Sequence, residues 1–436
     1  MLFHLDFLGC RLNEAEIASW KRQLHQQGHT LVQEVQEADI IILNTCAVTG
    51  EASKKSRQKL RRLNRKNPKA GLVVTGCYAS LEPQKIANEL GVNLVVPNKD
   101  KEKLIKEITT HFSIPHAPPQ STFPDAQPAF ADARTRAFIK VQDGCHNRCS
   151  FCIVSKARGA ERSKSIASVL EEITHLQGLG FQEVILTGVH LGGYGRDIGS
   201  SLVELVENII EHTSIPRIRI GSLEPWELSD AFFELFKEKR LCPHLHLPLQ
   251  SGSNSVLKRM IRKYTIEEYK TLVNKARAIR MDIHISTDVI VGFPGESDQE
   301  FQETLQNIRD IQFGDMHIFK YSPRVGTAAA RLRNRVSKSV ATERYMQLQA
   351  QRKEQQKHFQ QRFFGDHRMV LWERNAHKID DDQWIWYGYT DNYIRVYTIS
   401  KQPLFNQITK SKIEEKTSKG VRSTVLQTSE QMLYFS

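Results

Sequence analysis

Apolar residues along the chain fall into short runs separated by longer amphipathic stretches, a pattern typical of alternating strands and helices. In the first part of the chain these runs are residues 2–8, 39–43, 71–75 and 93–96, with helical patterns between them. Repeated strand–helix units of this kind predict a parallel sheet with helices on both faces. We therefore expect an open parallel α/β domain over residues 1–112.

The pattern is interrupted by a proline-rich stretch and then resumes. Residues 113–130 show no periodicity, which predicts a linker. Residues 131–365 contain six strand-like runs, at 137–141, 183–187, 217–220, 244–249, 282–290 and 316–321. Six strand–helix units predict a partial (β/α)6 barrel, whose functional groups are expected at the carboxyl ends of its strands.

After Gly365 the helical period gives way to alternation. Residues 368–372, 384–389 and 393–397 are strand-like, and residues 390–392 have the composition of a turn. This predicts a small all-β domain over residues 366–436. Tyr and Trp residues mixed with Lys and Arg are typical of surfaces that stack unpaired bases, although some of these rings must form the core of so small a domain.

Composition adds a basic charge and bears on the cellular compartment. The 61 Lys and Arg residues outnumber the 49 Asp and Glu residues, for a formal net charge of +12. This excess favours a polyanionic partner such as nucleic acid, with an inert basic surface as the alternative. An odd number of cysteines, 7, argues against a secreted disulfide framework. Without a signal-peptide pattern or an apolar run near ~18 residues, we expect a soluble cytoplasmic protein and no membrane partner.

Three cysteines follow the first strand of the expected barrel at the spacing Cys-x3-Cys-x2-Cys. They are Cys145, Cys149 and Cys152. Three thiolates on one tight loop suit a [4Fe–4S] cluster, which usually takes four, so one iron would be left free to bind another ligand. Zinc is the alternative, although structural zinc prefers four ligands and His146 is poorly placed within the loop to be the fourth.

Three further cysteines each follow a strand of the N-terminal sheet by one to three residues. They are Cys10, Cys46 and Cys77. Because the carboxyl ends of parallel strands share one edge of a sheet, these thiols should converge. They predict a second metal site, whereas a lone buried cysteine is usually a small hydrophobic residue. The basic stretch at residues 54–66 is either a solvated helix face or a phosphate-binding face.

The cysteine loop, on the first strand of a strand–helix region, resembles the signature of the radical S-adenosylmethionine (SAM) enzymes. The order of segments resembles the radical SAM methylthiotransferases over essentially the whole chain. The motifs that carry this resemblance are residues 9–13, 44–49, 75–78, 143–145, 157–159, 247–253 and 288–296. The sequence departs from the family at residues 154–156, where a Pro-Tyr pair is common, and at Lys164, where Arg is usual.

The resemblance implies two [4Fe–4S] clusters, with Cys145, Cys149 and Cys152 holding the one that binds SAM. It implies that an electron passes to SAM, that the resulting radical removes hydrogen from C2 of an adenosine, and that the cluster on Cys10, Cys46 and Cys77 holds or supplies sulfur. It also implies an external electron donor and a TRAM-like C-terminal domain. Candidate SAM-binding residues at the expected barrel mouth are Gly188, Glu224, Gln250 and Ser251, with loop capping as the alternative for Glu224 and Gln250.

Within the family, the motifs at residues 9–13, 44–49 and 388–393 are most similar to members that act on N6-threonylcarbamoyladenosine at position 37 of tRNA. Isopentenyladenosine in tRNA and an aspartate of a ribosomal protein are the alternative substrates. A non-catalytic iron–sulfur or zinc RNA-binding protein is the alternative from another class. Basic residues after the cysteine loop could contact SAM, the cluster or RNA phosphate, and they are Lys156, Arg158, Arg162 and Lys164.

Overall fold

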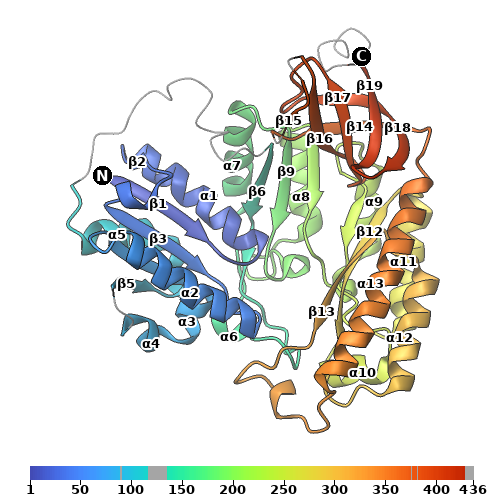
Figure 1. Cartoon of the computed structure of the whole chain (residues 1–436), viewed down its shortest axis with the longest axis horizontal. Helices are drawn as coiled ribbons and strands as arrows, with labels where there is room; N and C mark the ends of the chain where they lie inside the picture. Colours follow the sequence, from blue (N-terminus) through green and yellow to red (C-terminus); the bar gives the residue numbers. More distant parts are fainter. Residues whose placement is uncertain (89–90, 116–134, 375, 381, 428–436) are drawn as a thin grey trace.

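The computed structural model describes residues 1–88, 91–115, 135–374, 376–380 and 382–427. In it the chain forms an N-terminal α/β domain, an incomplete barrel and a C-terminal β-domain (Figure 1). This arrangement confirms the expected fold class. From residue 116 onward, the linker expected at 113–130 lies outside the described residues.

The N-terminal domain is a parallel sheet with the strand order β2-β1-β3-β4-β5. Its strands are β1 (Leu2–Phe7), β2 (Thr30–Leu31), β3 (Ile40–Thr45), β4 (Gly71–Gly76) and β5 (Val92–Val96). Its helices are α1 (Arg11–Gln26), α2 (Gly50–Lys66), α3 (Cys77–Leu81), α4 (Pro83–Ala87) and α5 (Leu104–His111). Ile40 and Ile42 pack on one face of the sheet, and Ile41 and Leu43 pack on the other. Burial on both faces explains why β3 is a continuous apolar run.

Six parallel strands in chain order make the incomplete barrel. They are β6 (Arg136–Lys140), β9 (Glu183–Thr187), β10 (Arg217–Ile220), β11 (His244–His246), β12 (His284–Val291) and β13 (Asp315–Lys320). Two parallel bridges, Ile218 with Leu241 and Ser222 with His246, join the half that contains β10 to the half that contains β11. The outer helices are α7 (Ile166–Gly178), α8 (Leu202–His212), α9 (Asp230–Glu234), α10 (Asn254–Met260), α11 (Ile266–Ile279), α12 (Asp298–Ile311) and α13 (Lys338–Gln361).

Strand alternation gives the barrel an apolar outer face and a largely polar inner face. Leu245, Ile285, Val289 and Met316 are among the buried residues that pack beneath the helices in the main core. Because successive side chains on a strand point to opposite faces, the residues between them face the barrel interior. Two of the covering helices, α11 and α12, begin with capping boxes at Thr265 and Ser297, respectively.

The C-terminal domain is a mostly antiparallel sheet that curls on itself, with one parallel pairing between its fourth and sixth strands. Its strands are β14 (His367–Trp372), β15 (His377–Lys378), β16 (Trp384–Thr390), β17 (Arg395–Ser400), β18 (Ile408–Thr417) and β19 (Gly420–Gln427). The sheet closes because β14 pairs with both β18 and β16. The strand expected at residues 393–397 starts two residues later, because Tyr393 takes a left-handed turn conformation with φ of +68°.

Most of the aromatic residues expected at an RNA surface have structural positions instead. Trp386 and Tyr397 are buried in the β-domain. Tyr389 and Tyr393 stack on each other, with ring centroids 4.9 Å apart, and face the barrel. Trp384 remains 36% exposed. The sequence interpretation that some of these rings form the core of the domain is confirmed by Trp386 and Tyr397.

Tyr393 joins the β-domain to the amino-terminal ends of the barrel strands. Its ring lies 4.5 Å from the guanidinium of Arg219 and 4.5 Å from the ring of His244, and Arg136 donates to its hydroxyl at 3.3 Å. Beside it, the buried carboxylate of Glu183 pairs with Arg219 at 2.9 Å and with Arg217 at 2.8 Å. This end of the barrel is covered by the β-domain (Figure 1), so the carboxyl ends of the strands form the accessible mouth.

We predict that the Glu183 ion group makes the fold sensitive to acid. Burial by itself raises the pKa of Glu183, but Arg217 and Arg219 outweigh it and lower the pKa to about 2. Because the folded pKa is below the unfolded one, the stabilisation is complete above about pH 4.5 and is lost as the pH falls toward 2. Glu183→Gln should lower the free energy of unfolding at pH 7 by about 3 kcal/mol and should flatten its decline between pH 5 and 2.

Urea unfolding of the metal-free protein across this pH range measures the effect. The matched control is Glu171→Gln, which changes an exposed carboxylate on α7 and should stay within about 0.5 kcal/mol of wild type. Equal stability of the two variants at pH 7 would contradict the assignment.

Candidate functional site

The cysteine loop follows a two-residue strand, β7 (Gln142–Asp143), which pairs with β8 (Arg162–Ser163). Gly144 opens the loop with φ of +76°, and a Cβ atom there would lie 1.8 Å from the carbonyl oxygen of Ala160. Only glycine fits so close an approach of two backbone segments. The loop ends in α6 (Val154–Arg158), and it carries all three cysteines of the first motif.

Each thiol of this loop has an N–H group directed at its sulfur. The donor–sulfur pairs, each 3.4 Å apart, are the backbone nitrogen of Asn147 with Cys145, the backbone nitrogen of Val154 with Cys152, and Nη1 of Arg262 with Cys149. Such donors stabilise negative charge on sulfur, which is the form that ligates iron.

Burial keeps these thiols protonated while no cation is bound. It raises the pKa of Cys145 to about 11 and that of Cys152 to about 12. A coordinating metal removes the proton outright, because its positive charge far exceeds that of the nearby dipoles. The loop therefore has the donor set and the surroundings of a metal site rather than those of a nucleophilic cysteine.

The structure also brings Cys10, Cys46 and Cys77 together at one edge of the N-terminal sheet. They follow β1, β3 and β4, which are neighbours in the sheet. A Cβ atom at Gly9, whose φ is +111°, would lie 2.9 Å from Sγ of Cys46. Burial raises the pKa of Cys46 to about 11, and the nearby thiols of Cys77 and Cys10 add to this rise. The glycine thus leaves room for the side chain of Cys46 beside the loop that carries Cys10.

The spacing of the sulfurs favours clusters over single zinc ions. Around a single metal ion, the ligand atoms lie close to one another. In the described residues, the groups of three or more possible ligand atoms that lie within 4.8 Å of one another include neither cysteine triad. An iron–sulfur cube places each thiolate on a different iron, so its ligands stand further apart. The side chain of His146, the fourth zinc ligand considered from sequence, is 69% exposed. Both triads fit a cluster better than a mononuclear site.

A buried ion network joins the two cysteine edges. Arg158, the last residue of α6, extends from the barrel into the N-terminal domain and is only 3% exposed. Its Nη1 contacts Asp143 at 2.9 Å and Glu16 at 3.1 Å, and its Nη2 donates to Asn13 Oδ1 at 2.8 Å. Asp143 immediately precedes the cysteine loop, and Asn13 lies on α1, three residues after Cys10. One guanidinium therefore links the residues beside both triads.

Further buried contacts complete this interface. Lys101 contacts Glu16 at 2.5 Å, and the two are almost fully buried together. The side chain of Asn98 donates to the carbonyl of Ala157 at 2.8 Å and lies 3.8 Å from Sγ of Cys77. Burial raises the pKa of Glu16, but Lys101 and Arg158 outweigh it and hold the pKa far below its ordinary value. The network is thus ionised in the folded protein.

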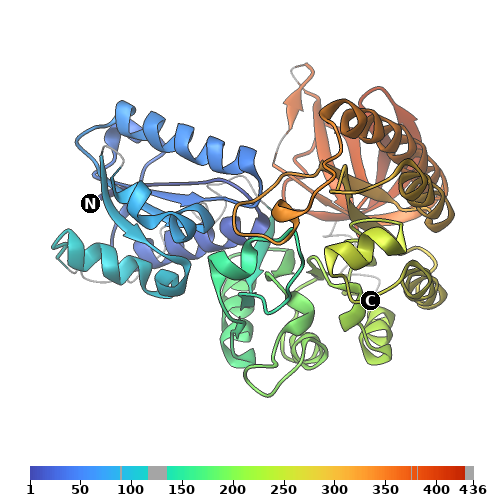
Figure 2. The same cartoon turned by 90° about the horizontal axis from the view of Figure 1, so that it is seen from below.

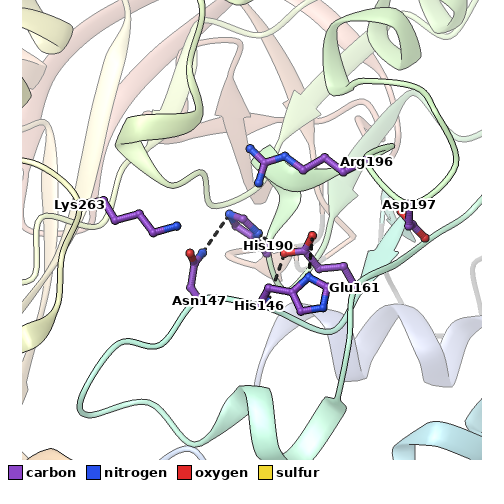
Figure 3. A pocket seen from close by; sticks show the side chains of 7 residues that line it. All are labelled: His146, Asn147, Glu161, His190, Arg196, Asp197 and Lys263. Atoms are coloured by element: carbon purple, nitrogen blue, oxygen red, sulfur yellow. Dashed lines mark hydrogen bonds and ion pairs between the residues drawn. The ribbon is translucent and has the colours of Figure 1, made fainter.

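A polar pocket of about 260 Å³ lies beside the cysteine loop (Figure 3). It is lined by His146, Asn147, Glu161, His190, Arg196, Asp197 and Lys263. In Figure 3 the ring of His190 lies between Asn147, 3.1 Å from its Nε2, and Glu161, 2.7 Å from its Nδ1. Ligand atoms of Glu161, His190 and Cys145 lie within 4.8 Å of one another. Charged groups of both signs therefore adjoin the first cysteine of the loop.

The four residues expected to bind SAM differ in their surroundings. Glu224 accepts a hydrogen bond from Arg262 at 2.5 Å. Arg262 also donates to Sγ of Cys149, so it links Glu224 to the cysteine loop. Gly188 lies against Gln142. The side-chain oxygen of Gln142 accepts hydrogen bonds from the backbone nitrogens of Val189 and His190, which positions the loop after β9. Gln250 has a left-handed backbone, with φ of +66°, and lies four residues after the fourth barrel strand, where it forms a parallel bridge with Val289 of β12.

Ser251, the fourth of these residues, is fully buried. Its hydroxyl lies 3.3 Å from that of Thr304 on α12. The structure therefore gives Ser251 a packing partner outside the barrel mouth, whereas Glu224 lies beside the cysteine loop.

The four basic residues after the cysteine loop differ in their partners and in their exposure. The guanidinium of Arg158 is buried in the ion network, so it cannot contact RNA. Lys156 donates to the carbonyl of Gly326 at 2.6 Å, and Lys164 pairs with Glu172 at 2.9 Å. Lys156 is an exposed residue, whereas Arg162, whose side chain is 40% exposed, also donates to the carbonyls of Arg158 and Ala160. The basic helix α2 begins near the segment after β13, where Gly50 contacts Ser322 and Ser53 contacts Arg324 (Figure 2).

Sequence reasoning did not single out Asn13, Glu16, Lys101, Glu161 or Arg262. Their types and spacing carry no periodic signal. Asn13 lies within the motif at residues 9–13, but nothing in the local sequence shows which distant group each of the five would meet.

Comparison with protein families matches two segments of the chain. Residues 139–308 match the Radical SAM superfamily, and residues 2–97 match the Uncharacterized protein family UPF0004. The matched ranges contain the two cysteine triads.

Curated relatives cover most of the chain. It is 36% identical over 419 residues to "Threonylcarbamoyladenosine tRNA methylthiotransferase MtaB" from Bacillus subtilis (strain 168), covering 93% of this chain and 92% of the relative. It is 34% identical over 357 residues to "tRNA-2-methylthio-N(6)-dimethylallyladenosine synthase" from Thermodesulfovibrio yellowstonii, covering 79% of this chain and 81% of the relative.

A solved structure supports the fold. The radical S-adenosylmethionine methyltransferase TsrM from Kitasatospora setae, with cobalamin and a [4Fe-4S] cluster bound, superposes with a TM-score of 0.55 at 15% identity. The match covers 74% of this chain and 76% of that one. At this identity the likeness concerns the fold alone.

We predict that the buried network is what fixes the N-terminal domain on the barrel. Arg158→Met removes the buried cation that Glu16 and Asp143 share, so it should lower the free energy of unfolding of the metal-free protein by about 3–5 kcal/mol. Urea unfolding at pH 7 measures this.

The matched control is Arg22→Met. Arg22 on α1 pairs across the same domain boundary with Glu172 of α7, but its side chain is partly exposed. Loss of that pair should cost less than about 1 kcal/mol. Similar losses of unfolding free energy for the two variants would show that the buried Arg158 network stabilises the interface no more than the partly exposed Arg22 pair does.

Proposed function

The chain belongs to the radical SAM methylthiotransferase family, and we propose that it adds a methylthio group to C2 of N6-threonylcarbamoyladenosine at position 37 of tRNA. Relatives named for threonylcarbamoyladenosine match at 35–39% identity, and those named for dimethylallyladenosine at 33–34%. The observation that carries the proposal is the pairing of two cysteine triads through one buried network, because methylthio transfer needs two adjacent cofactor sites acting on one atom.

Two [4Fe–4S] clusters belong to this proposal, one on Cys145, Cys149 and Cys152 and one on Cys10, Cys46 and Cys77. When bound, the first cluster and SAM supply a carbon-centred radical able to remove hydrogen from a C–H bond too inert for acid–base catalysis. The chain's own contribution is to orient these groups and exclude water. The N–H donors at the sulfurs and the guanidinium of Arg262 would balance the negative charge of the first cluster.

The polar pocket beside the cysteine loop is suited to the methionine end of SAM. That group carries a carboxylate and an ammonium close together, and the pocket offers the cation of Lys263 and the carboxylate of Glu161. Glu224, Gly188 and Gln250 surround the same mouth and remain proposed contacts for SAM. Ser251 remains among the candidates, although its hydroxyl lies against Thr304.

The exposed basic surfaces fit the phosphate backbone of tRNA. Exposed cations on the β-domain are Lys410, Lys412, Lys416, Lys419 and Arg422. Their charge, with that of α2 in the N-terminal domain, favours RNA through counterion release. The proposal includes a TRAM-like role for the β-domain, an external electron donor and a cytoplasmic location. Among the described helices, none has the length and apolar character needed to cross a membrane.

We predict that deletion of the gene removes 2-methylthio-N6-threonylcarbamoyladenosine from cellular tRNA. Wild type should restore this nucleoside, whereas Cys145→Ala should not, because a ligand of the first cluster is lost. Mass spectrometry of tRNA nucleosides measures both outcomes. Loss of the isopentenyl counterpart instead would identify isopentenyladenosine as the substrate. An unchanged tRNA profile would reject both tRNA substrates and leave the ribosomal-protein aspartate as the substrate to test.

We also predict that the two triads bind iron independently. Anaerobically reconstituted wild type should contain about eight iron atoms per chain, and replacing either triad by alanines should leave about four. Iron and zinc analysis with electron paramagnetic resonance checks this. The control is Cys242→Ala, since Cys242 is buried in the barrel away from both triads and should keep the wild-type iron content. Zinc at one atom per triad would reject the cluster assignment.

A further inference from the structure

Three side chains from neighbouring barrel strands form a group on the inner face that the proposed cofactor sites do not use. His246 on β11, Asp288 on β12 and His317 on β13 alternate with residues that pack beneath the helices, so they face the interior. Nε2 of His246 and Nδ1 of His317 each lie 3.2 Å from the same carboxylate oxygen of Asp288. The three form one hydrogen-bonded unit.

This group lies between the covered end of the barrel and its mouth. His246 forms a parallel bridge with Ser222. Ser222 follows Arg219, a residue of the covered end, by three positions and so lies closer to the mouth. The carbonyl of Asp288 accepts a hydrogen bond from the backbone of Gln250 at 2.8 Å, and Gln250 is a mouth residue. A base that enters through the mouth would therefore meet this group before it reaches the covered end.

The three side chains differ in access. His246 is mostly buried, and its Nδ1 lies 2.9 Å from the hydroxyl of Ser286. The side chain of His317 is 55% exposed, and β13 is the edge strand of its sheet. Within the described part of the chain, no hydrogen bond involves Nε2 of His317. Its Nδ1 edge is thus fixed by Asp288, and its Nε2 edge is open to a ligand.

Charge also suits an anionic ligand. The hydrogen bond that His317 Nδ1 donates to the carboxylate of Asp288 raises the pKa of His317, which favours the imidazolium form. Because Asp288 is shared between two imidazoles, the negative charge near His317 is spread over both partners. The ring therefore presents a fixed, charge-assisted N–H donor to the interior.

We propose that His317 is a specificity-determining residue that binds the carboxylate of the threonylcarbamoyl group, with Asp288 and His246 as the residues that position its ring. This inference rests on the proposed function and deepens it by naming what separates the two tRNA substrates. The threonylcarbamoyl group has a carboxylate for this donor. An isopentenyl group is a hydrocarbon, and it would displace water while leaving the donor unpaired, which a polar site disfavours strongly.

The test uses reconstituted holoenzyme and anticodon stem-loop RNAs that carry threonylcarbamoyladenosine, isopentenyladenosine or unmodified adenosine at the target position. Fluorescence anisotropy gives Kd without SAM, and product formation gives kcat and KM. The variants are His317→Phe, which removes the donor, and His317→Gln, which keeps a neutral one. The control is His212→Phe, since His212 is an exposed imidazole on the outer helix α8.

We expect His317→Phe to weaken binding of the threonylcarbamoyl RNA about tenfold and to lower kcat/KM on it about 10- to 100-fold. Binding of the unmodified RNA should change less than about twofold, and the preference over isopentenyl RNA should fall. His317→Gln should recover part of the loss, and His212→Phe should match wild type. A purely structural role would lower affinity for all three RNAs together.

Four outcomes would overturn the inference. Unchanged binding of the threonylcarbamoyl RNA by both His317 variants, or equal weakening for all RNAs, would do so while leaving the proposed function intact. Stoichiometric zinc that is lost on substitution of His317 would show that the same three side chains hold a metal ion instead. If wild type does not act on the threonylcarbamoyl RNA at all, the proposed function fails first and this inference fails with it.

Discussion

The buried pairing of Arg158 with Glu16 and Asp143 is the constraint on which the arrangement of this protein depends. A charge taken out of water is tolerated only when partners are placed within hydrogen-bonding distance, so small displacements are strongly penalised. Arg158 belongs to the barrel, Glu16 belongs to α1 of the N-terminal domain, and Asp143 leads into the cysteine loop. The network therefore fixes the edge that carries Cys10, Cys46 and Cys77 against the mouth that carries the other triad.

A second ion group has the complementary role at the opposite end of the barrel. Glu183, Arg217 and Arg219 fill the interior beneath Tyr393, whose left-handed turn directs its ring at the strand ends. The cysteine loop and the polar pocket lie at the other end of the barrel, beyond the carboxyl ends of the strands. At that end the N-terminal domain meets the segment after β13 (Figure 2).

The N-terminal domain and the barrel together supply the groups near the carboxyl ends of the strands, and the polarity of these groups has a functional consequence. One side offers the sulfur-bearing loops, and the other offers the hydrogen-bonded group of His246, Asp288 and His317. Because these imidazoles and the carboxylate already satisfy one another in part, the interior can remain polar without a large desolvation penalty before substrate arrives. A radical enzyme gains from such order, since a reactive group held in a defined chamber has few competing partners.

The sequence by itself determined the fold class, both cysteine triads and the family, because these depend on local features. Period-two and period-3.6 patterns set the strands and helices, and a cysteine directly after a parallel strand must lie at the carboxyl edge of the sheet. Only the tertiary structure decided that Arg158 is buried between domains, that Ser251 lies against α12, and that Tyr389 and Tyr393 face the barrel. It also brought His317 to Asp288. These outcomes depend on contacts between residues far apart in the chain, and a charged, polar or aromatic side chain has no sequence signal that identifies its distant partner.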